Sequence, residues 1–118
     1  MEIKIFKSKN INYAEIISDE IIINNVQDAL DLMANCRYQG SENLIMYKYQ
    51  FKDEFFDLKT GIAGEILQKF SNYSCRLAII GDFLNVKSKS LSDFIYESNK
   101  GGRVVFAVSI EDAIGMFS

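Results

Sequence analysis

The chain contains no histidine and no proline, and only two of its 118 residues are cysteines. Without histidine, a Ser-His or Cys-His nucleophilic pair is impossible, and the usual zinc and non-haem iron sites lose their main ligand. Cys36 and Cys75 each lie in an apolar segment, and no CxxC motif is present. They are therefore expected to be buried, reduced thiols rather than a disulfide or a metal-binding pair.

Positive charge and long apolar runs are also scarce. The formal charge is -3 and the pI is near 4.9. Because affinity for nucleic acid depends largely on Lys and Arg, no nucleic-acid partner is expected. No apolar run approaches the length of a membrane span, and the opening residues MEIKIF show no secretory signal. We therefore expect no membrane partner and a cytoplasmic location.

The spacing of apolar side chains predicts alternating strands and helices. Period-two or β-rich runs predict strands in EIKIFK, INYAEIIS, NLIMYKY and RVVFAV. The continuous apolar run from Leu77 to Ile80 is typical of a central strand covered on both faces. Helical spacing, with capping residues at the ends, predicts helices over residues 25–40, 62–70, 88–102 and 109–117.

The predicted order is β-β-α-β-α-β-α-β-α, in which every later strand is followed by a helix. Such alternation predicts an α/β fold whose sheet is mixed but mostly parallel and packed with helices. No linker, repeat or low-complexity tract interrupts the chain, and its length suits one hydrophobic core. Residues 1–118 are therefore expected to form a single domain.

The segment DEFFDLKTG, residues 53–61, places carboxylates and a hydroxyl directly before the second predicted helix. One interpretation is structural, with Asp57 and Thr60 as caps and with Phe55 and Phe56 anchoring the loop on the core. The other is a functional turn, because free backbone N–H groups and the helix dipole would stabilise a phosphate on Thr60. These residues alone leave both interpretations open.

A second candidate site lies where the loops leave the carboxyl ends of the parallel strands. These loops gather at one edge of a sheet, where ligands prefer to bind. Clustered carboxylates there could serve a small substrate as a general base or hold a cation such as magnesium. Their spacing matches no EF-hand loop, and no cofactor is expected. The residues of this candidate ligand edge are Asp53, Glu54, Asp82, Asn85 and Ser88.

Five aromatic residues could in principle form a platform for stacking nucleobases. They lack a strongly basic surround, which such a platform requires. We therefore expect Tyr47, Tyr49, Phe51, Tyr73 and Tyr96 to pack in the core or at its edge.

Several longer stretches resemble an uncharacterised bacterial family, domain of unknown function 4180. They are VQDALDLMANCRY, EFFDLKTGIAGEILQKFSNY, RLAIIGDF and KSLSDFIYESNKGGRVVF. This resemblance covers nearly the whole chain and implies a bacterial protein, but it implies no particular activity.

The element order also resembles, more remotely, that of STAS domains, the anti-sigma-factor-antagonist type of regulatory module. That family carries an Asp-Ser-Ser-Gly turn whose serine before glycine is phosphorylated to switch partner binding. By this resemblance Asp57, Thr60 and Gly61 correspond to the aspartate, the switch residue and the glycine. One residue is inserted here, and Leu58 and Lys59 replace the first serine.

Two classes of function follow as hypotheses. The leading one is a small cytoplasmic regulatory or protein-interaction module, with a protein partner and a switch turn at Asp57–Gly61. The alternative is a small-ligand-binding protein or an enzyme that uses the candidate ligand edge. A homodimer formed by pairing of an edge strand, near Ile3–Phe6 or Val104–Val108, is a further hypothesis.

Overall fold

The computed structural model describes residues 1–118, which form one five-stranded sheet with the order β1-β2-β3-β4-β5 and four α-helices. The predicted element order and the mixed, mostly parallel sheet are confirmed. The strands are β1 (Glu2–Ser8), β2 (Ile11–Ile17), β3 (Asn43–Tyr47), β4 (Arg76–Ile80) and β5 (Val104–Ala107). The helices are α1 (Val26–Tyr38), α2 (Ile62–Asn72), α3 (Lys89–Gly101) and α4 (Ile110–Met116).

The first two strands form an antiparallel hairpin joined by a two-residue turn. Lys9 and Asn10 both have positive φ angles, 51° and 68°, as the tightest hairpin turns require. The register places Phe6 opposite Tyr13, and the two rings stack with centroids 5.4 Å apart. From β2 onward each strand pairs in parallel with the next.

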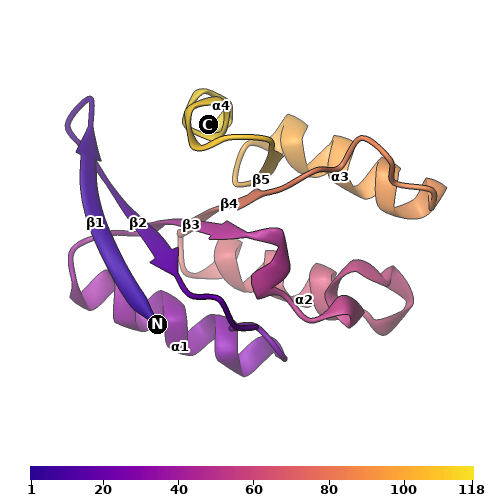
Figure 1. The fold of residues 1–118 in the computed structure, drawn as a ribbon, viewed down its shortest axis with the longest axis horizontal. Helices are drawn as coiled ribbons and strands as arrows, with labels where there is room; N and C mark the ends of the chain where they lie inside the picture. The colour runs from indigo at the N-terminus through magenta and orange to yellow at the C-terminus, as the bar shows by residue number, and fades with distance from the viewer.

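The helices cover the two faces of the sheet unequally. Because each parallel strand is added beside the previous one and such crossovers are right-handed, α1, α2 and α3 lie on the same face. They bury the larger core cluster, which contains Leu32, Ile66, Leu44 and Phe106. On the other face α4 packs on β4 and β5 around the smaller core cluster (Figure 1). The two buried clusters leave β4 covered on both faces, as its continuous apolar run predicts.

Side chains of α3 satisfy outer backbone groups of the edge strand β5. Both predicted edge segments lie at sheet edges, since β1 and β5 end the strand order. On β5, the side chain of Asn99 accepts from Phe106 N at 2.7 Å and donates to Phe106 O at 3.3 Å. Ser98 Oγ donates to Val104 O. Side chains of α3 therefore occupy the positions on β5 that another strand would use.

The helix ends follow the capping residues. Asn25 accepts from Asp28 N at 2.9 Å at the start of α1, and Ser109 accepts from Asp112 N at 3.1 Å at the start of α4. Gly102 ends α3 with a φ of 77°, the left-handed conformation that favours glycine. Cys36 and Cys75 are free thiols and both are buried, as predicted. None of the helices combines the length and the apolar character needed to span a membrane.

Two sequence-based expectations were wrong. The third strand ends at Tyr47 rather than at Tyr49, because the buried Gln50 side chain accepts from Tyr47 N at 3.0 Å and turns the chain into a 3-10 helix, Lys48–Gln50. Tyr49, Tyr73 and Tyr96 are not core residues, since they are 55%, 50% and 65% exposed. Periodicity places a side chain on a face but does not say whether that face is covered.

Candidate functional site

A pocket of about 580 Å³ opens at the carboxyl ends of β3 and β4. Two loops form its walls: residues 48–57 follow β3, and residues 82–88 follow β4. The volume is that of a small-molecule site, and carboxyl ends of parallel strands are where α/β folds bind ligands. The lining residues are Lys48, Asp53, Phe56, Asp57, Asp82, Phe83, Asn85, Val86, Lys87, Ser88 and Leu91.

The candidate ligand edge largely comes together in this pocket. Asp53, Asp82, Asn85 and Ser88 all line it, and so does Asp57 from the predicted switch turn. Glu54 does not line it, and its carboxylate forms an ion pair with Lys52 at 3.0 Å. The convergence follows from the sheet order, since β3 and β4 are neighbours and their loops leave the same edge.

The three pocket aspartates are held to different extents. Asp57 Oδ1 accepts from Lys59 N at 3.2 Å, and Asp82 Oδ1 accepts from Leu84 N at 3.0 Å. Each of these carboxylates keeps its second oxygen free, and Asp53 has no partner within the chain. The chain's three ion pairs all lie outside the pocket, so several carboxylate oxygens there are exposed and have no partner within the chain.

Sequence reasoning missed Lys48, which stands at the centre of the site. Its Nζ donates to Asp82 O at 3.0 Å and lies 5.0 Å from the centroid of the Phe83 ring. The side chain crosses directly over Gly81, where a Cβ would lie only 2.7 Å from Lys48 Cβ. Glycine is therefore needed at the end of β4 for Lys48 to tie the two loops together. The run NLIMYKY gave no signal for this role, because it is typical of a strand that continues past Lys48.

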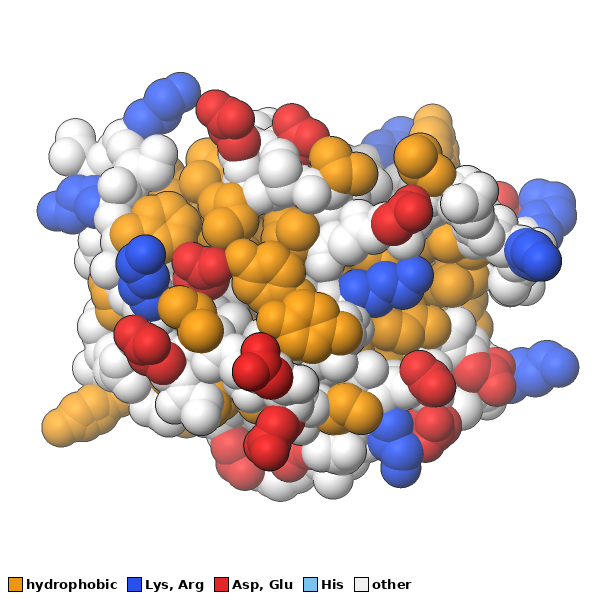
Figure 2. All heavy atoms as spheres, viewed as in Figure 1, with side chains coloured by type: hydrophobic (Ala, Val, Ile, Leu, Met, Phe, Trp, Pro, Cys, Tyr) orange, Lys and Arg blue, Asp and Glu red, His pale blue; other side chains and the backbone are white.

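An adjoining hollow extends the site onto the face of the sheet that carries α4, in the part that α4 does not cover. It has a volume of about 590 Å³ and shares Lys48, Asp53, Phe56 and Asp82 with the pocket. Its other walls are mainly apolar, including Tyr47 and Tyr49, whose stacked rings lie 5.8 Å apart. In the space-filling view, hydrophobic side chains gather over the sheet between the β1–β2 hairpin and α4 (Figure 2). The edge of the sheet thus offers a polar half and an aromatic half on either side of Lys48.

The Tyr47 hydroxyl is fixed beside this hollow. It donates to Glu15 Oε2 at 2.6 Å, and burial together with this bonded carboxylate raises the pKa of Tyr47 to about 12. Tyr47 therefore stays a neutral hydrogen-bond donor throughout the physiological range.

The predicted switch turn lies beside the pocket and is ordered by its own hydrogen bonds. Thr60 Oγ1 is 2.8 Å from both Glu54 O and Asp57 O, to which its hydroxyl donates, and it accepts from Ile62 N at 3.3 Å. Gly61 has a φ of 76°, so its left-handed conformation favours glycine. Thr60 and Gly61 do not line the pocket, and Asp57 is the residue that belongs to both the turn and the pocket. The predicted capping of α2 by Asp57 and Thr60 is wrong: α2 begins after Gly61 without a side-chain cap, and Asp57 caps the short 3-10 helix Leu58–Thr60 instead.

The acidic residues do not assemble into a metal centre. No group of three or more Asp, Glu, Cys or His side chains lies close enough to hold a metal ion. The pocket therefore offers carboxylates as separate hydrogen-bond acceptors around a cavity.

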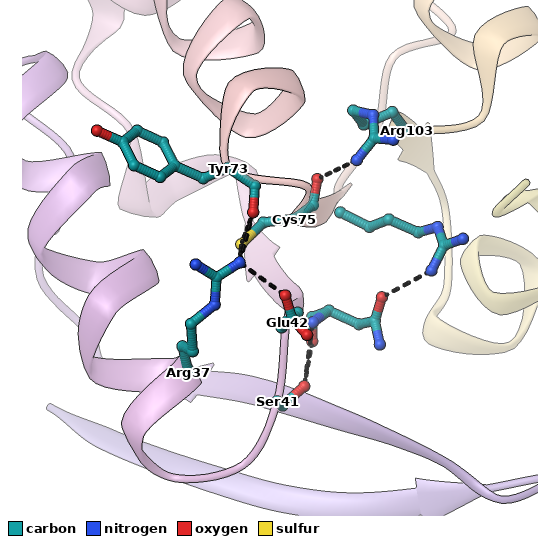
Figure 3. A network of polar contacts seen from close by, with 8 residues as sticks. Arg37, Ser41, Glu42, Tyr73, Cys75 and Arg103 are labelled. Carbon is teal, nitrogen blue, oxygen red and sulfur yellow. Dashed lines mark hydrogen bonds and ion pairs between the residues drawn. The ribbon is translucent and has the colours of Figure 1, made fainter.

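A second polar network lies at the opposite, amino end of the parallel strands. Arg37 Nη2 donates to Glu42 Oε2 at 2.6 Å and to the carbonyl of Tyr73, and it lies 3.5 Å from Cys75 Sγ (Figure 3). Burial raises the pKa of the Cys75 thiol, although the nearby Arg37 charge opposes this effect. Arg103 Nη1 donates to Cys75 O at 3.0 Å. These contacts fix the end of α2 against α1, while burial keeps the Cys75 thiol protonated.

The fold and the pocket define a small α/β domain with a candidate ligand site at the carboxyl edge of its sheet. The chain belongs to the family described as Domain of unknown function (DUF4180), whose sequence profile matches residues 8–117. No curated protein and no solved structure matches the chain.

Proposed function

We propose that this domain binds a small polar molecule in the pocket between the loops that follow β3 and β4. The observation that carries the proposal is the convergence of Asp53, Asp57 and Asp82 with free carboxylate oxygens around one cavity. Polar groups that gather around a partly apolar cavity at a sheet's carboxyl edge are typical of ligand sites in α/β folds.

The lining favours a ligand that donates hydrogen bonds and carries a positive charge. Three carboxylates outnumber the two ammonium groups of Lys48 and Lys87, and Lys48 already donates to a backbone carbonyl. The rings of Phe56 and Phe83 provide apolar surface for the rest of the molecule. An amine-bearing metabolite with a flat or aliphatic body satisfies both requirements.

A thermal-shift panel tests this proposal. Small amines, amino sugars, amino acids and nucleosides are compared with inorganic phosphate and dicarboxylates. A ligand that binds only the folded state raises the melting temperature. We expect the shift with amines alone, and we expect it to be lost in Asp53→Asn and Asp82→Asn, which keep the size of the side chain.

The matched control is Asp112→Asn, which removes the same charge from the first turn of α4, outside the pocket. It should retain the full shift. A shift with anions, or one that persists in both pocket variants, would contradict an acidic site for amines.

A second candidate function is the regulatory or protein-interaction module, and we infer its surface to be the turn Asp57–Gly61 with the start of α2. Its support is the exposed Thr60, whose hydroxyl hydrogen closes the turn onto Glu54 O or Asp57 O. A phosphoryl group on Oγ1 would replace that hydrogen, so the turn would lose these bonds and gain negative charge. The likeness to STAS domains adds only the element order and the positions of Asp57, Thr60 and Gly61.

A pull-down from bacterial lysate with wild type, Thr60→Glu and Thr60→Val tests this second function. Thr60→Val removes the turn's hydrogen bonds without adding charge. A protein retained by wild type and Thr60→Val but lost by Thr60→Glu would support a charge switch. Equal retention by the wild type and both variants would show that Thr60 does not control partner binding.

A further inference from the structure

The outer edge of β1 is an open strand edge. β1 ends the sheet (Figure 1), and residues 1–8 make no hydrogen bond other than those to β2. The two strands pair through seven consecutive positions without a bulge, and β1 has extensive contacts with β2 alone. On the opposite edge, side chains of α3 cover β5. Long, regular edges that nothing covers are the ones that pair with another strand.

The backbone groups of alternate β1 residues point away from β2. Ser8 and Ile11 flank the two-residue turn and form a hydrogen-bonded pair, and such pairs alternate along an antiparallel ladder. The even-numbered residues of 2–8 therefore bond to β2. The N–H and C=O groups of the odd-numbered residues point outward, where they are free to bond to a second strand.

We propose that this edge is the interface of a symmetric homodimer, in which the two copies of β1 pair antiparallel. The two-fold axis passes through Ile3, perpendicular to the sheet, so the sheets of the two copies join into one. The proposal is independent of the ligand pocket, which lies at the carboxyl ends of β3 and β4.

The sequence of β1 is self-complementary about this axis. A two-fold axis perpendicular to the sheet keeps every side chain on its own face, so each residue meets the one equally far on the other side of Ile3 in the second copy. Glu2 and Lys4 flank Ile3 on the same face, so Glu2 of each copy lies directly opposite Lys4 of the other. Opposite charges at such positions, with Cβ atoms about 4.5–5.5 Å apart, stabilise the pairing. The contact occurs twice.

Both charges are available for this contact. Glu2 and Lys4 are exposed, and neither takes part in an ion pair within one copy. Lys4 lies opposite Glu15 of β2, but Glu15 accepts a hydrogen bond from the Tyr47 hydroxyl instead. In the dimer Lys4 would lie in one row between Glu15 of its own copy and Glu2 of the second.

The other face of β1 is matched by apolar contacts. There Ile3 meets Ile3 of the second copy, and Met1 meets Ile5. Met1 is 64% exposed and Ile5 is 36% exposed, while Ile3 packs against the larger core cluster. The pairing therefore covers exposed apolar side chains and extends this core across the interface. Since the outward backbone groups belong to these residues, the two Ile3 residues also exchange a pair of hydrogen bonds.

Other positions of the axis lose the charge match. An axis through Lys4 would set this lysine against its own counterpart, and like charges directly opposite each other are destabilising. An axis through Ile5 would place Glu2 opposite Ser8, so Lys4 would gain no carboxylate from the second copy. The axis through Ile3 is the one that pairs both charges.

Sedimentation equilibrium on the full chain tests the proposal with Glu2→Lys, with Lys4→Glu and with an equimolar mixture of the two. In each variant alone two pairs of like charges would meet across the axis, so we expect the dissociation constant of the dimer to rise about tenfold or more. In the mixture a heterodimer of the two variants has opposite charges in both pairs, so association should recover. Recovery in the mixture is a result that simple misfolding of either variant would not give.

The matched control is Glu20→Lys, which makes the same change of charge at an exposed position outside β1. It should remain a dimer. Circular dichroism checks that all three variants are folded.

Cross-linking gives a second, positive readout. Glu2→Cys mixed with Lys4→Cys should form an intersubunit disulfide with oxidised glutathione, because Cα atoms of such a pair lie about 4.5 Å apart, within reach of a disulfide. Each variant alone should cross-link far less, since the equivalent positions of the two copies are diagonal neighbours about 7–8 Å apart. Cys36 and Cys75 are buried and should not react.

Two results would overturn the proposal. One is a wild-type chain that is monomeric at millimolar concentration. The other is a dimer that either charge variant leaves unchanged, because such a dimer would use a different register or a different surface.

Discussion

Replacing Gly81 by alanine should destabilise the protein, because the Lys48 side chain occupies the space that a methyl group would need. A Cβ at position 81 would lie 2.7 Å from Lys48 Cβ and 3.2 Å from its Cδ. Carbon atoms in van der Waals contact are about 3.5–4.0 Å apart, so the ends of β3 and β4 would have to separate by roughly 1 Å. Overpacking of this kind costs about 1–3 kcal/mol of unfolding free energy.

A matched control distinguishes this clash from the general effect of replacing glycine. Gly64 lies on the exposed side of α2, and a Cβ there would meet no atom within 4 Å. Gly64→Ala should therefore stabilise the protein by up to about 1 kcal/mol through helix propensity. Urea unfolding followed by circular dichroism measures both variants, with unchanged m values.

A double-mutant cycle identifies the colliding atom. The closest contact is Lys48 Cβ, which alanine retains, so Lys48→Ala should not relieve the cost of Gly81→Ala, whereas Lys48→Gly should relieve most of it. If Gly81→Ala proves as stable as wild type, the close crossing of Lys48 over the end of β4 is wrong. The wall of the proposed pocket would then be wrong with it.

Three further predictions concern the groups that order the sheet and its core. Asn99→Ala should lower the free energy of unfolding by about 1–3 kcal/mol, because the outer edge of β5 loses its hydrogen-bond partners. The freed edge should also promote aggregation, which light scattering measures. Unchanged solubility and stability would contradict this role of Asn99. Gln50→Leu should lower the free energy of unfolding, measured in urea, by about 2–4 kcal/mol, because Tyr47 N and Ile16 O lose their buried partner. An unchanged free energy of unfolding would contradict this role of Gln50. Burial raises the pKa of Cys36 from 9.0 to about 12. Its contribution to stability is therefore complete below pH 9 and is lost as the pH rises to about 12, since the unfolded thiol ionises first. Thermal unfolding at alkaline pH should show this loss of stability, and the loss should be smaller in Cys36→Ala.

Most of the fold could be predicted because its signals are local. Capping residues such as Asn25 and Ser109 mark helix starts, and the apolar run Leu77–Ile80 marks a central strand. The site could be predicted in part, because loops after neighbouring parallel strands must share an edge. That rule brought Asp53 and Asp82 together without any knowledge of side-chain direction.

The remaining features depend on long-range contacts that periodicity does not contain. The side chain of Gln50 ends β3 early, and Lys48 then turns back across Gly81. Neither effect has a local signal. The exposure of Tyr38 and Tyr73 likewise depends on which helix faces the fold leaves uncovered.

Ligand binding at the carboxyl edge is tested most directly by a ¹H–¹⁵N NMR titration with a panel of small amines. We predict saturable chemical-shift changes in the amides of residues 53–57 and 82–88, and we expect these changes to weaken strongly in Asp53→Asn and Asp82→Asn. Saturable shifts that cluster elsewhere, or a panel that leaves these two loops unchanged, would contradict it.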